Sequence, residues 1–235
     1  PDCYAELGYP KGFILTKKSW SEADSTTIDK EYIQTKIQEG VFIPFLNSTG
    51  FTENTPDPTD QEFADGTKVN VRSGKPEFQF DFTKSYNFQK IAVKYNSFSK
   101  YNVILVFDND SMLLAHSNGS LSGFNAGMIH TNTFSHNTGS EVGMTPIRFQ
   151  LLDNKQYNNG GILTAEFDLT GEIKCVLDAT LVASENGTDV DVTVKSEINP
   201  LFDVLGLTDA EFSLVVNGVR EQPSAVTQNA DNSYT

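Results

Sequence analysis

The segment 75–117 constrains the fold of this chain more than any other. It opens with strict alternation, which places three phenylalanines on one face of a strand: Phe78, Phe80 and Phe82. The period then changes to 3.6 residues, which predicts a short helix with one apolar face: Phe88, Ile91, Ala92 and Tyr95. Two strands follow at Val103–Phe107 and Met112–Ala115, joined by a turn at 108–110. We expect the helix to cover the aromatic face of the first strand and form a core with it.

The rest of the first 175 residues also predicts strands. Periodic apolar residues indicate strands at four further places: Gly12–Thr16, Phe124–Thr133, Val142–Leu152 and Ile162–Leu169. Pro146 lies near the start of the third and indicates an edge strand or a bulge. A second helix is predicted at Thr27–Gln38, after the capping cluster 25–27. The expected fold of residues 1–175 is mainly β, a rolled β-sandwich or barrel with one or two flanking helices.

Residues 47–75 predict a long loop inside this domain, because they are rich in Asn, Thr, Pro, Asp and Gly. Loops of this length are uncommon in compact domains unless they are functional or disordered. The segment also contains apolar residues that a solvated loop does not need: Phe51, Phe63, Val69 and Val71. We predict that these four residues contact another subunit in an oligomer interface.

Residues 176–235 have a sequence pattern different from that of residues 1–175 and predict a small β module. Strands are expected at Val176–Ala183 and Val190–Val194, with Asn-Gly hairpin signals at 186–187 and 217–218. Residues 225–235 resemble a hairpin of bacterial immunoglobulin-like modules. A complete immunoglobulin sandwich needs about seven strands and about 100 residues, which is more than this segment contains. The module is therefore either cut short or a reduced sandwich appended to the first domain.

Charge and composition exclude several classes of protein. The chain has 17 Lys and Arg against 31 Asp and Glu, a net charge of −14, which argues against binding along a phosphate backbone. No apolar run approaches the roughly 18 residues of a membrane span. The first residues lack the basic and apolar regions of a signal peptide, so we expect a cytoplasm-like compartment. There a disulfide between Cys3 and Cys175 is possible, but two reduced thiols are favoured.

The residues that carry chemistry do not form a recognisable site in the sequence. The histidines His116, His130 and His136 lack metal-ligand spacing with Cys or Glu. The turn that begins at Asp108 lacks the Gly and Glu of a calcium loop, since Leu113 and Gly119 stand at those positions. The sequence does not exclude a catalytic pair of carboxylates for glycoside hydrolysis, because the two members of such a pair meet only in the fold. We therefore expect a protein that is not an enzyme, with no catalytic residues, no cofactor and no metal.

Three segments of the central region carry a family resemblance: 73–82, 101–107 and 122–128, together with the helix that ends near Tyr95. They resemble virion structural proteins of phages that infect Bacteroidetes, including crAss-like phages, and the order of elements is similar to the tail-tube fold. The resemblance implies a subunit that assembles with copies of itself into a ring or tube of a tail or a head–tail connector. It further implies contacts with other virion proteins, a virion location after assembly in the host cytoplasm, and an acidic lumen that DNA passes without sequence-specific binding.

Two other classes of function are compatible with the sequence. The first is a carbohydrate- or surface-binding β-sandwich, which Asn/Gly-rich turns and aromatic residues such as Trp20, Phe124 and Tyr157 favour. The second is a hydrolase or isomerase on a β scaffold, which only scattered Asp and Glu residues support. An oligomer of defined size favours the virion subunit, and a monomer favours the binding module.

Overall fold

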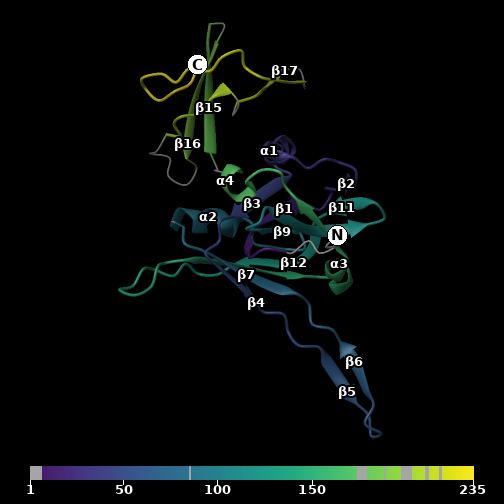
Figure 1. The fold of residues 1–235 in the computed structure, drawn as a ribbon. Helices are drawn as coiled ribbons and strands as arrows, with labels where there is room; N and C mark the ends of the chain where they lie inside the picture. The colour runs from purple at the N-terminus through teal and green to yellow at the C-terminus, as the bar shows by residue number, and fades with distance from the viewer. Residues whose placement is uncertain are drawn as a thin grey trace. The chain divides into compact units, whose positions relative to one another are not determined.

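The computed structural model describes residues 7–84, 86–173, 179–187, 189–196, 203–209, 212–216 and 219–235. The chain divides into two compact units, Pro1–Val176 and Leu177–Thr235 (Figure 1). The protein is mainly β, with 44% strand and 14% helix, so the expected fold class is confirmed. The larger unit is β-sandwich-like, and all its strand pairs are antiparallel.

The first sheet of the larger unit is built around β1 (Pro10–Lys17) and β9 (Tyr101–Phe107), which pair along most of their length. The other members of this sheet are β3 (Phe42–Leu46) beside β1, then β10 (Ser111–Ser117) beside β9, β14 (Gly160–Thr164) and β11 (Ser120–Ser122) beside β10, and β2 (Glu22–Ala23) beside β11. The expected turn at 108–110 joins β9 to β10. Both faces of β1 and β9 are buried, which explains their nearly continuous apolar sequences.

The second sheet faces the first and is continuous with it through one strand. Its order is β12 (Phe124–Thr131), β13 (Thr145–Leu151), β7 (Glu77–Phe82) and β4 (Gly50–Glu53), with the short β8 (Ser97–Phe98) also beside β12. The start of β12 pairs with β9, and the rest pairs with β13 from Ala126 on, with an irregularity in that ladder between Ala126 and Met128. This bend lets the chain pass from one sheet to the other and rolls the sandwich.

Pro146 does not mark an edge strand, because β13 lies between β12 and β7. Its carbonyl accepts a hydrogen bond from the Asn132 N–H at 2.8 Å, just beyond the end of β12. An ordinary residue at this position would return a bond to the Asn132 carbonyl. The Gln89 side chain donates to that carbonyl instead, at 2.8 Å. The side chain of Gln89, in the helix that follows β7, thus takes the place of the backbone N–H that proline lacks. This is why proline is tolerated inside the sheet.

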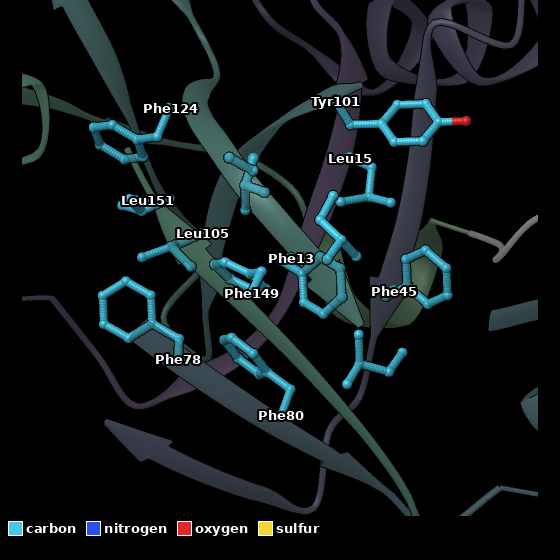
Figure 2. Close-up of a cluster of buried hydrophobic side chains, with 14 of the residues drawn as sticks. Phe13, Leu15, Phe45, Phe78, Phe80, Tyr101, Leu105, Phe124, Phe149 and Leu151 are labelled. Atoms are coloured by element: carbon cyan, nitrogen blue, oxygen red, sulfur yellow. The ribbon is translucent and has the colours of Figure 1, made fainter. Parts of the chain in front are cut away.

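The core between the sheets is aromatic. Phe13 of β1 lies 5.3 Å from Phe80 and 5.0 Å from Phe149, measured between ring centroids, and stacks on Phe45 (Figure 2). Phe78, Phe80 and Phe82 are all buried, as the alternation predicts. The prediction that the helix covers this aromatic face holds for only one end of the strand. The helix α2 (Tyr86–Lys94) reaches β7 only there, where the Phe88 ring lies 5.1 Å from Phe82. The strand face is covered mainly by β1, since alternation defines a buried face without defining what packs on it.

The opposite face of the first sheet is covered by α1 (Lys30–Gln38) and α4 (Leu169–Glu172). The helix α1 begins later than predicted, because its N-cap is Asp29, which accepts from the Tyr32 N–H at 2.8 Å. The residues 25–27 stand before the helix and do not cap it. The short helix α3 (Asn154–Asn158), capped by Asp153, completes the larger unit.

The smaller unit contains two hairpins. The strands β15 (Ala179–Asn186) and β16 (Asp189–Ser196) are joined by the predicted tight turn, in which Gly187 has φ +68°. The strands β17 (Leu214–Val216) and β18 (Val219–Glu221) form the second hairpin. The buried Tyr234 lies beside β16 and donates its hydroxyl to the Val204 carbonyl at 2.8 Å. The turn 217–218 and both cysteines, Cys3 and Cys175, lie outside the described residues.

Candidate assembly interface

The chain from Glu53 to Glu77, named the arm here, forms a hairpin instead of the predicted loop. Its strands β5 (Thr59–Glu62) and β6 (Lys68–Arg72) form a two-stranded sheet of their own, and Figure 1 shows them projecting beyond the ends of β4 and β7. The residues of both strands are exposed. The loop prediction for 47–75 is wrong because the many turn formers lie between short strands, which occupy 50–53, 59–62 and 68–72.

One face of the arm carries exposed apolar side chains. Val69 is opposite Gln61 in the hairpin register, and Phe63 follows Gln61 by two residues, so Phe63 and Val69 share a face. Their exposed fractions are 51% and 46%, and Val71, the extra residue of a bulge in β6, is 62% exposed. A lone two-stranded hairpin is only marginally stable in water. The arm therefore presents apolar side chains that stay about half exposed or more among the described residues.

Phe51 differs from the other three residues predicted for the interface. It lies on β4 and pairs with Phe80 of β7 in the sheet register. Its ring lies 5.0 Å from that of Phe80 and 5.9 Å from that of Phe78, and it is partly buried against the aromatic core. Phe51 is thus partly covered by its own chain, and its predicted contact with another subunit stays a prediction. The structure brings Phe63, Val69 and Val71 together on the arm and places Phe51 at the sheet edge.

The tip of the arm is acidic around Phe63. Glu62 forms an exposed ion pair with Lys68 at 3.5 Å, and Asp60 and Asp65 lie on either side in sequence. The Thr67 N–H donates to the Asp65 carboxylate at 2.9 Å, and this hydrogen bond lowers the pKa of Asp65 below its ordinary value. The tip thus presents an aromatic ring among three carboxylates, of which one already has a lysine partner.

The base of the arm is well ordered by hydrogen bonds. The Asn54 N–H donates to the Glu77 carbonyl at 2.8 Å, and the Asn154 side chain donates to the Gly74 carbonyl. A Cβ on Gly74 would lie 1.7 Å from the Pro56 carbonyl oxygen, so the two backbones touch there. The arm therefore leaves the sandwich through a fixed, narrow base.

A second surface feature, named the lysine hollow here, lies at one end of the first sheet. It has a volume of about 700 Å³ and is lined by Lys17, Lys18, Ser19, Ile37, Gly40, Phe42, Ile43, Tyr95, Lys100 and Tyr101. The strand ends meet here, because Lys17 pairs with Tyr101 and Thr16 with Phe42. Lys18 donates to the Ser99 hydroxyl at 2.8 Å, and the Lys100 ammonium lies 5.2 Å from the Tyr101 ring centroid. Among the described residues that line it, none is acidic.

A third feature is a hollow of about 640 Å³ beside α2, named the aromatic hollow here. It is lined in part by Tyr86, Phe134 and His136, whose rings contact one another edge to face, and by Lys90 and His130. The aromatics that favoured carbohydrate binding in the sequence lie elsewhere. Trp20 and Phe124 are buried in the core, and Tyr157 is partly buried against Phe78 and Phe124. Those three residues do not form a binding surface.

Among the titratable groups of the described residues, one hydrogen-bonded network centres on Tyr32. No three of the described His, Cys, Asp and Glu side chains lie close enough to hold a metal ion. Burial raises the pKa of Tyr32 above its ordinary value, assisted by the hydrogen bond that its hydroxyl donates to Glu22 at 2.6 Å. The same hydroxyl accepts from the Trp20 indole N–H at 2.9 Å, so this group anchors α1 in the core.

Comparison with protein-family models, with curated proteins and with solved structures gives no match for this chain. Within the part of the chain that the structure describes, no helix is long and apolar enough to cross a membrane.

Proposed function

We propose that this chain is a non-enzymatic structural subunit that assembles with copies of itself into the ring or tube of a phage tail or a head–tail connector. In this proposal the subunit assembles in the host cytoplasm and acts in the virion beside other virion proteins. It does not bind nucleic acid in a sequence-specific way. The resemblance of residues 73–128 to phage virion proteins supports the class. The arm supports the mode of action.

The single observation that carries the proposal is the arm with its exposed apolar side chains. Exposed apolar side chains that cluster on a projecting element mark contacts with other proteins. Two features of the sandwich also fit an assembling subunit. The strand β4 pairs with β7 alone, and β14 pairs with β10 alone, so each has a second edge without a strand partner among the described residues. Open edges of this kind can pair with a neighbouring chain.

Removal of the arm tests the proposal directly. Because Pro56 and Gly74 touch, residues 57–73 can be replaced by a short Gly-Ser link without moving β4 or β7. We expect the intact chain to sediment as a closed oligomer of defined size and the variant without residues 57–73 to sediment as a folded monomer. The fluorescence of Trp20, the one tryptophan of the chain, reports whether the sandwich is folded.

A matched control shortens the other long connection, residues 132–144 between β12 and β13, at its tip. Its outer turn, where the Thr138 N–H donates to the Glu141 carbonyl at 2.9 Å, is exposed. The control variant replaces residues 137–142 by Gly-Gly and should assemble like the intact chain. Oligomers of normal size from the variant without residues 57–73 would overturn the role given to the arm.

A carbohydrate- or surface-binding module is the second candidate, and the aromatic hollow is the observation that favours it. Aromatic rings such as Tyr86 and Phe134 can stack on sugar faces, and Lys90 and His130 offer hydrogen bonds beside them. Screening of the intact chain against a panel of glycans, with Phe134→Ala as the comparison, tests this candidate. Binding by a monomeric chain that Phe134→Ala abolishes would favour it over the assembly subunit.

A further inference from the structure

We infer that the tip of the arm of one subunit inserts into the lysine hollow of the next copy of this chain. The inference rests on the proposed self-assembly and identifies the surface that receives the arm. It commits to a second copy as the occupant, for reasons of charge, shape and position that are independent of one another.

Charge is the first reason. The chain has 31 acidic against 17 basic residues, so a hollow bordered by Lys17, Lys18 and Lys100 is unusual on its surface. The arm tip supplies the opposite charge through Asp60, Glu62 and Asp65, which outnumber the one lysine there, Lys68, the partner of Glu62. Two copies with net charge −14 repel one another except where positive and negative surfaces meet. The hollow and the tip are such a pair.

Shape and polarity are the second reason. Between its lysines the hollow is lined by apolar and aromatic side chains, among them Ile37, Tyr95 and Tyr101. Phe63 at the tip is a half-exposed aromatic ring with Asp65 in the turn after it, whereas Glu62 lies on the other face of the hairpin beside Lys68. An aromatic anchor in a central pocket with charged groups at the rim is the usual arrangement of an energetic hot spot. The tip supplies the ring for such a pocket, and Asp65, in the turn that follows Phe63, supplies a carboxylate for its rim.

Position is the third reason. The arm leaves the sandwich next to Glu77, at the start of β7, whereas α2, which leads to Tyr95 of the hollow, follows the far end of that strand at Phe82. Figure 1 shows the arm and α2 toward different ends of the larger unit. From Pro56 to Phe63 the extended chain spans at most about 25 Å, and in Figure 1 it runs away from α2. The contact therefore joins two copies.

The opposite placement also defines the symmetry. The contact uses two different surfaces of the same chain, so it is head-to-tail. Head-to-tail contacts produce closed rings when the rotation closes, and helical tubes when it does not. The inferred contact thus accounts for a ring or tube, whereas a two-fold contact between identical surfaces would produce a dimer.

Charge reversal on both sides of the contact tests the inference. The tip variant combines Glu62→Lys with Asp65→Lys, and the hollow variant combines Lys18→Glu with Lys100→Glu. We expect each variant alone to lose self-association, measured by sedimentation velocity, by at least about tenfold in apparent affinity. An equimolar mixture of the two should recover association between unlike subunits, because each variant then meets its complementary charge in the other.

Control variants place the same changes elsewhere on the exposed surface. Glu141→Lys with Glu172→Lys matches the tip variant in net charge, and Lys84→Glu with Lys155→Glu matches the hollow variant. Both controls should assemble like the intact chain. A further variant, Phe63→Ser, tests the apolar anchor without a change of charge and should also weaken assembly.

The outcomes separate the inference from the proposed function. If the hollow variant assembles normally while removal of residues 57–73 abolishes assembly, the arm binds another surface and the inference is overturned, but the proposed function stands. If the intact chain is a monomer at all concentrations, the proposed function and the inference both fail. Loss of assembly in both single variants, with recovery in the mixture, establishes the contact.

Discussion

Replacement of Phe80 by alanine is the sharpest test of the core that supports these surfaces. Phe80 has no exposed surface, and its ring centroid lies 5.3 Å from that of Phe13, 5.0 Å from Phe51 and 5.9 Å from Phe149. Truncation of a buried phenylalanine costs about 3–5 kcal/mol of the free energy of unfolding. Each aromatic pair contributes about 0.5–1.5 kcal/mol beyond its buried area, so loss of three pairs places Phe80→Ala in the upper half, at about 4–5 kcal/mol.

The measurement is equilibrium unfolding in urea, followed by Trp20 fluorescence. Trp20 is 5% exposed, lies in the second apolar cluster on the far face of the first sheet and contacts Phe42 at 4.9 Å between ring centroids. It reports unfolding of the larger unit without touching Phe80. In a thermal scan the same loss should lower the melting temperature by roughly 8–20 °C, at about 2–4 °C per kcal/mol.

Phe63→Ala is the matched control, because it makes the same substitution on the exposed arm. We expect it to change the free energy of unfolding by no more than about 0.5 kcal/mol. Equal unfolding midpoints for Phe80→Ala and Phe63→Ala would refute the reasoning, since they would show that the Phe80 side chain is not packed between the two sheets.

Three further predictions concern other parts of the fold. Gly12→Ala should destabilise the larger unit by about 1–3 kcal/mol in urea unfolding, because its Cβ would lie 2.3 Å from the Phe45 carbonyl oxygen, whereas Gly139→Ala, with nothing within 4 Å, should leave stability unchanged. Tyr32→Phe should cost about 1–3 kcal/mol, because the indole N–H of buried Trp20 loses its acceptor. Burial raises the pKa of Tyr32 above the ordinary 10.0, so the unfolded chain releases this proton first and stability falls as the pH rises through 10; urea titrations at pH 8 and 11 should show a smaller fall in Tyr32→Phe.

The periodic segments of the fold could be predicted from the sequence. The alternation in 76–83 correctly indicates a strand with three buried phenylalanines, and the change of period correctly indicates α2. The element that covers this strand could not be predicted, because the partner, β1, is more than 60 residues away and is itself buried on both faces. The sequence of β1 shows apolar character without showing which side faces which layer.

The candidate interface was predicted only in part. The residues 68–72 alternate Val with polar residues, which is a strand signal that the surrounding turn formers obscured, whereas Thr59–Glu62 is wholly polar and has no signal of its own. Phe63, Val69 and Val71 were identified because apolar residues stand out in a polar segment. The lysine hollow could not have been found, since its lining comes from separate places near residues 17, 40, 95 and 100 that meet only at the ends of antiparallel strands.

Sedimentation velocity of the intact chain over a range of concentrations tests the central claim most directly. At about 0.15 M salt the screening length is about 8 Å, so the general repulsion between acidic subunits is weakened while direct lysine–carboxylate contacts persist. The account predicts a concentration-dependent change from monomer to one larger species of defined size, which removal of residues 57–73 abolishes. A single monomeric species at every concentration, from the lowest detectable to the limit of solubility, would contradict the account.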